Sequence, residues 1–174
     1  MLSEKEFGKI YEEYADKIFR HCFFRVFNRR RAQELMQDTF LHAWQYNIKG
    51  EEIRNVRAFL YRIANNLVID ESRKKKDLLW EDIKVNKNNN DQDEIEFDPG
   101  EDNREELQDQ IDGRLAMETL NELEQNHREV IVMRYIDDLY PKEIAELTGE
   151  SANVISVRIN RALKELRKKI QKNV

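Results

Sequence analysis

The sequence has 174 residues, a net charge of −5 and only five Gly and two Pro, a composition that favours one or two small helical domains over a turn-rich β fold. Its single cysteine, Cys22, excludes an internal disulfide, and neither a signal peptide nor the ~20 apolar residues of a membrane span can be recognised. We therefore expect a soluble protein of the reducing cytoplasm that does not insert into a membrane.

Three amphipathic helices are predicted in the first part of the chain. Ser3 and Glu6 have the spacing of a capping box, and apolar residues then recur every three or four positions until about residue 28. A second helix is expected over residues 30–45, and a third begins after a plausible N-cap, Asn55, and ends near residue 76. Their matching apolar faces predict one helical bundle over residues 1–76.

The composition changes sharply after this bundle. Residues 77–112 carry fourteen acidic and three basic residues, a net charge of −11, whereas the remainder carries 27 basic and 21 acidic residues, a net charge of +6. A stretch with so little apolar surface cannot offset the entropy lost on ordering, so we predict a flexible acidic linker over residues 77–104. The basic parts on either side are the candidates for contact with phosphate.

Helical spacing resumes in residues 105–174 and ends in a helix-turn-helix pattern. Pro141 suits the first turn of a short helix, and Gly149 can end that helix in the left-handed conformation. A last helix, capped by Ser151 or Asn153, carries seven Lys or Arg residues and one acid. Two helices joined by a Gly-containing turn, the second of them basic, are typical of a helix-turn-helix.

The last helix supplies the first set of candidate DNA-binding residues. Residues early in the second helix of such a motif reach base edges, and basic residues farther along hold phosphates. The candidates for base reading are Asn153, Ser156, Val157 and Asn160. The candidates for phosphate contact are Arg158, Arg161 and Lys164. The alternative interpretation is an ordinary solvated basic face.

A second polar surface is expected on the third helix, largely opposite its apolar face. It comprises Arg62, Asn65, Asn66, Asp70 and Arg73, followed by Lys74, Lys75 and Lys76. Asn and Arg can hydrogen-bond splayed bases, and a basic helix end can follow a nucleic-acid backbone. Taken alone, these are more simply solvent-exposed polar residues. On the second helix, Leu41 among polar residues suggests a face that meets a partner helix.

Several segments of the chain closely resemble the extracytoplasmic-function sigma factors. Region two of that family is resembled by the segments Ala32–Trp44 and Val56–Asp70, with Arg73. Region four is resembled by the segments His127–Val130, Glu143–Glu146 and Arg158–Ala162. The two regions occur in the order of the family, with an acidic segment between them. The chain departs from the family pattern at several positions. Asn153-Val154-Ile155 stands where the family usually has Gly-Thr-Val, Tyr140 replaces a small hydroxyl residue and polar Glu150 stands in the turn. The loop over residues 47–55 also lacks the aromatic residue often found there.

The resemblance implies an all-α transcription initiation factor that is not an enzyme and needs no cofactor or metal. Region two corresponds to residues 1–76 and region four to residues 105–174. The implied partners are core RNA polymerase, through the clamp helices of its largest subunit and its flap, promoter DNA and an anti-sigma factor. The residues implied to dock on the clamp helices are Gln37, Asp38 and Leu41.

The resemblance also implies two modes of promoter recognition. Region four would read the minus-thirty-five element as duplex in the major groove. Region two would engage the melted minus-ten strand and read an extruded base in a pocket. The residues implied for this strand are Asn65, Asn66, Asp70 and Arg73, together with the preceding loop.

Three alternatives come from other functional classes. An enzyme is disfavoured, because His21, His42 and His127 are dispersed, without Cys or carboxylate at metal-ligand spacing, and no phosphate-binding Gly loop or Ser/His/Asp motif occurs. A sigma-like decoy that sequesters an anti-sigma factor would need the protein-binding faces but not the basic ones. A dimeric operator-binding repressor would explain the helix-turn-helix and leave region two unused.

Overall fold

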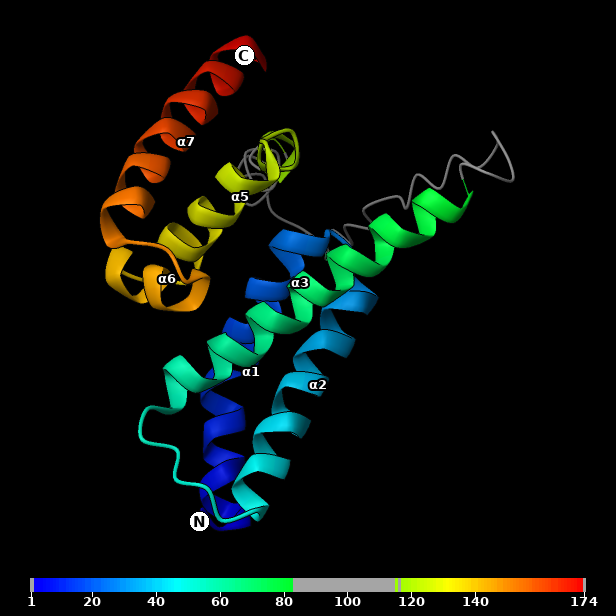
Figure 1. The fold of residues 1–174 in the computed structure, drawn as a ribbon, viewed down its shortest axis with the longest axis vertical. Coiled ribbons are helices and arrows are strands. Elements are labelled where there is room, and N and C mark those ends of the chain that lie inside the picture. The colour runs from blue at the N-terminus through cyan, green and yellow to red at the C-terminus, as the bar shows by residue number, and fades with distance from the viewer. Residues whose placement is uncertain (1, 83–114, 116, 174) are drawn as a thin grey trace, which may run out of the picture. The chain divides into compact units, whose positions relative to one another are not determined.

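The described part of the chain consists of helices in two units, which confirms the expected all-α class (Figure 1). The computed structural model describes residues 2–82, 115 and 117–173, and the side chains of residues 75–82 and 173 lie outside that description. The boundary between the two units falls between residues 94 and 95. Each unit is considered by itself.

The first unit is a bundle of three helices, α1 (Glu4–Val26), α2 (Arg29–Ile48) and α3 (Val56–Asp82), and each of them contacts the other two. The predicted capping box is confirmed, since the Ser3 hydroxyl accepts a hydrogen bond from the Glu6 backbone and the Glu6 carboxylate accepts one from the Ser3 backbone. The core contains apolar side chains from all three helices, among them Ile18, Cys22, Leu35, Phe40, Leu60, Ala64 and Val68.

A buried amide anchors the beginning of the described chain to the end of α2. Asn47, which is 1% exposed, accepts a hydrogen bond from the Leu2 backbone nitrogen at 2.7 Å and donates one to the Leu2 carbonyl at 2.9 Å. The two bonds satisfy the amide in the interior, where an unpaired polar group would be costly. They hold Leu2 next to the loop that leads to α3.

Helix α3 begins as expected and ends later than expected. The Asn55 side chain accepts a hydrogen bond from the Ala58 backbone at 3.0 Å, as an N-cap does. The helix continues to Asp82, so the first residues of the predicted linker are helical. The rest of the predicted linker, residues 83–104, lies outside the described residues.

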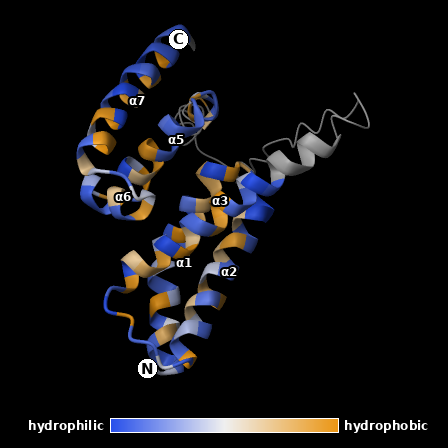
Figure 2. Ribbon diagram, viewed as in Figure 1, coloured by the Kyte–Doolittle hydropathy of each residue, from blue (hydrophilic) through white to orange (hydrophobic). Residues whose placement is uncertain are grey.

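The second unit contains helical residues 117–121, α5 (Gln125–Ile131), a π-helical turn η1 (Val132–Ile136), α6 (Pro141–Thr148) and α7 (Ala152–Asn173). Helix α7 contacts both α5 and α6. The core of the unit is apolar and includes Leu123, Val130, Met133, Leu139, Ile144, Ile155, Ile159 and Ala162. Figure 2 shows hydrophilic and hydrophobic residues interleaved along α7, the pattern of a helix with one buried face.

The turn between α6 and α7 has the predicted chemistry. Gly149 adopts a left-handed conformation, with φ of 75°, and its backbone nitrogen donates to the Ala145 carbonyl. The Ser151 hydroxyl accepts a hydrogen bond from the Val154 backbone at 3.3 Å, so Ser151 rather than Asn153 caps α7.

We expect Gly149→Ala to destabilise the second unit by about 1–2 kcal/mol, because a Cβ disfavours the left-handed conformation. Gly8→Ala is the matched control, since Gly8 lies within α1 and an added Cβ would meet no atom within 4 Å. The control should stabilise the first unit by up to about 1 kcal/mol. Native-state amide hydrogen exchange measures each unit separately, and equal effects of the two substitutions would contradict this account of the turn.

Candidate functional site

The outward face of α7 gathers most of the predicted region-four residues. Five of them are exposed and recur at spacings of three, four and one along the helix: Asn153, Val157, Asn160, Arg161 and Lys164. They lie opposite the buried side chains of Ile155, Ile159 and Ala162, because an α-helix turns once in 3.6 residues. The face is therefore amide-bearing and apolar near its start and basic farther along.

Two predicted region-four residues do not belong to this outward face. Ser156 is half-buried, and its hydroxyl donates to the Ala152 carbonyl at 2.9 Å. Arg158 is held by Glu150, with Nη1–Oε2 and Nη2–Oε1 distances of 2.6 and 2.7 Å. The hydrogen bonds from Arg158 lower the pKa of the Glu150 carboxyl, and the same bonds raise the pKa of Arg158. Both side chains are engaged within the protein.

Two further features of α7 were not predicted. Val154, an apolar residue in the first turn of the helix, is 46% exposed. Glu165, the one acid among the basic residues of this helix, lies with Oε2 2.5 Å from Nδ1 of His127 on α5. This hydrogen bond lowers the pKa of the Glu165 carboxyl. Glu165 is therefore used to join α7 to α5.

The outward face of α3 carries the second set of polar residues. The exposed members are Arg62, Asn66, Asp70, Arg73 and Lys74, at spacings that keep most of them on one side of the helix. Arg73 and Asp70 form an exposed ion pair at 3.9 Å, a geometry that contributes little to stability. Lys75 and Lys76 continue the helix, and their side chains lie outside the description.

Asn65 does not face outward, and the sequence-based expectation is wrong for this residue. Its side chain is 2% exposed, and its oxygen accepts a hydrogen bond from Nη1 of Arg25 on α1 at 2.8 Å. The same Arg25 nitrogen lies 3.1 Å from Nε2 of His21, whose ring meets that of Tyr61 edge-on. Asn65 follows buried Tyr61 by four residues, a spacing that could have revealed its inward position.

A charged contact between α2 and α3 supports the polar face of α3. Arg31 donates to both carboxylate oxygens of Glu71, at 2.8 and 2.7 Å, and also to Glu34 at 2.6 Å. These hydrogen bonds raise the pKa of Arg31. A two-pronged contact of this kind restricts orientation as well as distance. It fixes this turn of α3, which carries Asp70 and Arg73 on its outward face, relative to α2.

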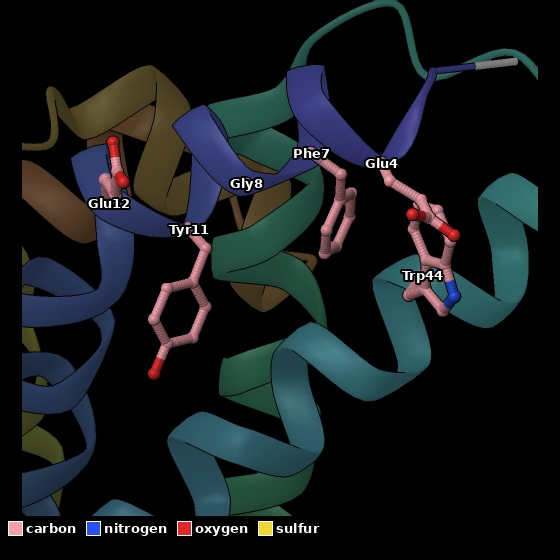
Figure 3. A pocket seen from close by; sticks show the side chains of 6 residues that line it. All are labelled: Glu4, Phe7, Gly8, Tyr11, Glu12 and Trp44. Atoms are coloured by element: carbon pink, nitrogen blue, oxygen red, sulfur yellow. The ribbon is translucent and has the colours of Figure 1, made fainter.

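An exposed apolar surface lies on the first unit. The predicted polymerase-docking residues on α2 are an exposed Gln37, a half-buried Asp38 and Leu41, which is 52% exposed. Ile48, 57% exposed, was not predicted and lies two turns after Leu41. Next to this row, an open groove lies between α1 and α2, with Phe7 and Tyr11 projecting from α1 and Trp44 from α2 (Figure 3). Glu4 and Glu12 also line the groove.

The described residues offer no setting for metal chemistry. Within residues 2–82, 115 and 117–173, His, Cys, Asp and Glu side chains nowhere form a group of three that could hold a metal ion. None of the helices in the described part of the chain combines the length and hydrophobicity required to cross a membrane.

Comparison with known proteins finds the same family at both units. The Sigma-70 region 2 model matches residues 10–77, and the Sigma-70, region 4 model matches residues 114–166. The chain is 31% identical over 181 residues to the ECF RNA polymerase sigma factor SigW of Bacillus subtilis (strain 168), covering 95% of this chain and 89% of that protein. It is 26% identical over 163 residues to the ECF RNA polymerase sigma factor SigL of Mycobacterium tuberculosis (strain ATCC 25618 / H37Rv), covering 93% and 87%.

Two solved structures share the fold. The sigma factor RpoE from Bartonella quintana, solved in complex with the anti-sigma factor NepR, has a TM-score of 0.74 and 21% identity, covering 96% of this chain and 98% of that chain. CnrH, solved in complex with the cytosolic domain of CnrY, has a TM-score of 0.68 and 21% identity, covering 99% and 92%. At this identity the likeness concerns the fold.

The adjacent amides on α3 give a direct test of its orientation. Asn65→Ala removes a buried acceptor of Arg25 and should lower the free energy of unfolding by about 1–3 kcal/mol. Asn66→Ala is the matched control on the exposed face and should change it by less than about 0.5 kcal/mol. Urea denaturation followed by tryptophan fluorescence measures both. A larger effect at Asn66 than at Asn65 would reverse the assigned orientation.

Proposed function

Because the chain belongs to the extracytoplasmic-function sigma factors of the sigma-70 family, we propose that it binds core RNA polymerase through α2, captures the melted minus-ten strand with α3 and reads the minus-thirty-five duplex with α7. Sigma factors are transcription initiation factors without enzymatic activity of their own, and region four binds DNA through its helix-turn-helix. One observation carries the proposal: each unit presents a continuous exposed row of polar and basic side chains on one helix.

The proposed duplex contacts follow from the order of residues along α7. The major groove admits an α-helix, and Asn amides can pair with adenine while apolar side chains contact the thymine methyl group. Asn153, Val157 and Asn160 occupy the first turns of the exposed face and are proposed to meet base edges. Arg161 and Lys164 follow on that face and are proposed to hold phosphates, which sets the orientation of the helix.

The proposed strand contacts use the chemistry of α3. Unstacked bases expose hydrogen-bonding edges that amide and guanidinium groups can reach, and basic side chains can follow the backbone of a single strand. The exposed residues proposed for these roles are Arg62, Asn66, Asp70, Arg73 and Lys74. The backbone of α3 carries Lys75 and Lys76 onward from this face. Asn65 is proposed to support the helix from the core.

The proposed docking surface on α2 combines an apolar centre with polar neighbours. Leu41 and Ile48 are exposed aliphatic side chains, and half-buried Trp44 lies between them along the helix. Exposed Gln37 and half-buried Asp38 flank this row. An apolar core with a polar rim is the usual composition of a specific protein interface. The proposed partner is the clamp-helix pair of the largest polymerase subunit, and the flap is proposed as the contact of region four.

We also propose that an anti-sigma factor regulates the chain, which is supported by the complex of the structurally similar RpoE with the anti-sigma factor NepR. A decoy that only sequesters such a factor remains the second candidate function. The exposed basic residues on both α3 and α7 favour an initiation factor, because a decoy has no use for them. The two candidates differ in whether RNA is made.

Run-off transcription on genomic fragments tests the proposal. Core polymerase with the chain should start RNA at defined promoters, whereas core alone should not. The double variant Arg161→Ala/Lys164→Ala should lose initiation on intact duplex and recover it on templates already melted at the minus-ten element. The double variant Arg62→Ala/Asn66→Ala should fail on both templates, because it removes proposed strand contacts. Core binding without any new start sites would instead support the decoy.

A substitution on α2 tests the docking surface. Leu41→Asp places a charge within the apolar row and should weaken binding to core polymerase roughly 10- to 100-fold, the equivalent of about 1.5–3 kcal/mol of lost apolar burial. Ile69→Asp, an exposed aliphatic residue on α3, is the control in the same unit and should leave core binding unchanged. Fluorescence anisotropy with labelled chain measures both affinities. Full retention of binding by the Leu41 variant would rule out this face.

A further inference from the structure

We infer that Arg158 is a positioning residue that acts on promoter DNA through Glu150, by neutralising that carboxylate and fixing the turn, and that it does not itself bind a phosphate. The inference rests on the proposed reading of duplex by α7 and refines it. In this view Arg158 orients the recognition helix and does not contact DNA directly. It also assigns a role to Glu150, which the family resemblance leaves unexplained.

Glu150 and Arg158 form an ion pair with two hydrogen bonds between the turn and α7. Glu150 stands directly after Gly149 in the turn, and Arg158 lies on the second turn of α7, eight residues later. Both terminal nitrogens of the guanidinium meet both oxygens of the carboxylate, at 2.6 and 2.7 Å. Two parallel charge-assisted hydrogen bonds restrain orientation as well as separation. The pair therefore ties the turn to the recognition helix.

The Glu150–Arg158 pair is partly shielded from solvent. The side chains of Arg158 and Glu150 are 26% and 33% exposed, respectively, whereas the neighbouring Val157, Asn160 and Arg161 are exposed on the outward face. The charge of Glu129 on α5 also raises the pKa of Arg158, so two carboxylates from the body of the unit act on this guanidinium. Arg158 is oriented toward its own protein.

Opening the Glu150–Arg158 pair would be electrostatically unfavourable near DNA. For Arg158 to hold a phosphate instead, it would have to release Glu150 and leave a partly buried carboxylate close to the phosphodiester backbone. An unpaired charge of this kind is costly, and its repulsion of phosphate offsets the attraction between Arg158 and the DNA. Keeping the pair intact presents a neutral turn beside the basic outward face. The unbroken pair is therefore the binding-competent arrangement.

A mutant cycle in the assembled holoenzyme tests the inference, with promoter affinity measured by filter binding over a range of salt concentrations. Arg158→Ala should weaken binding roughly fivefold, because it leaves Glu150 uncompensated. Its plot of log affinity against log salt should keep the wild-type slope, since no phosphate contact is lost. Glu150→Ala/Arg158→Ala should recover most of the affinity. Arg161→Ala, the matched control on the outward face, should reduce the slope by about one.

A charge-swapped variant distinguishes loss of the ion pair from a folding defect. Glu150→Arg/Arg158→Glu rebuilds the ion pair in reverse and should bind promoter close to the wild-type level, with circular dichroism confirming helix content. A reduced salt slope for Arg158→Ala, or a double alanine variant as weak as Arg158→Ala, would overturn the inference while leaving the proposed function intact. Failure of the wild-type holoenzyme to retain promoter DNA would overturn both.

Discussion

Burial of one apolar row on each helix is the constraint on which the binding surfaces of this chain depend. On α7, burying Ile155, Ile159 and Ala162 turns Asn153, Val157, Asn160 and Lys164 to the opposite side, because both sets follow the same 3.6-residue period. The same relation holds on α3, where Leu60, Ala64 and Val68 are inside and Arg62, Asn66 and Arg73 outside. Each functional face is thus presented by a helix that the core already holds in place, so little further ordering is needed on binding.

Polar contacts within the protein then select which residues of each face remain available. Arg25 engages Asn65, Arg31 engages Glu71, and Arg158 engages Glu150. Each contact joins two elements or a turn and a helix, and each withdraws a side chain that by composition alone would be assigned to nucleic acid. The number of Lys and Arg residues on a helix is therefore a poor measure of how many phosphates the helix can contact. What counts is the charge left after internal partners are satisfied.

Periodicity and capping chemistry were sufficient to predict most of the fold from the sequence. The start of α1 at its capping box, the approximate extents of α1 and α2 and the left-handed Gly149 turn are all local features, determined by residues within a few positions of one another. The Arg25 partner of Asn65 and the Glu150–Arg158 pair could not be predicted in this way. Asn65 meets an arginine forty residues earlier in the chain. Glu150, the partner of Arg158, is only eight residues away in the sequence, but the contact between them depends on the direction that α7 takes after the turn.

The two hydrogen bonds between the Asn47 side chain and the Leu2 backbone have a practical consequence for experiments on this chain. Because both backbone groups of Leu2 are held by the side chain at the end of α2, this end of the described chain lies next to the loop that precedes α3. A fluorophore or affinity tag placed there would lie beside the start of α3, the helix proposed to contact the melted strand. A label attached after α7 would instead be separated by several helical turns from the exposed residues proposed to read bases, which makes that end the less intrusive site for a reporter.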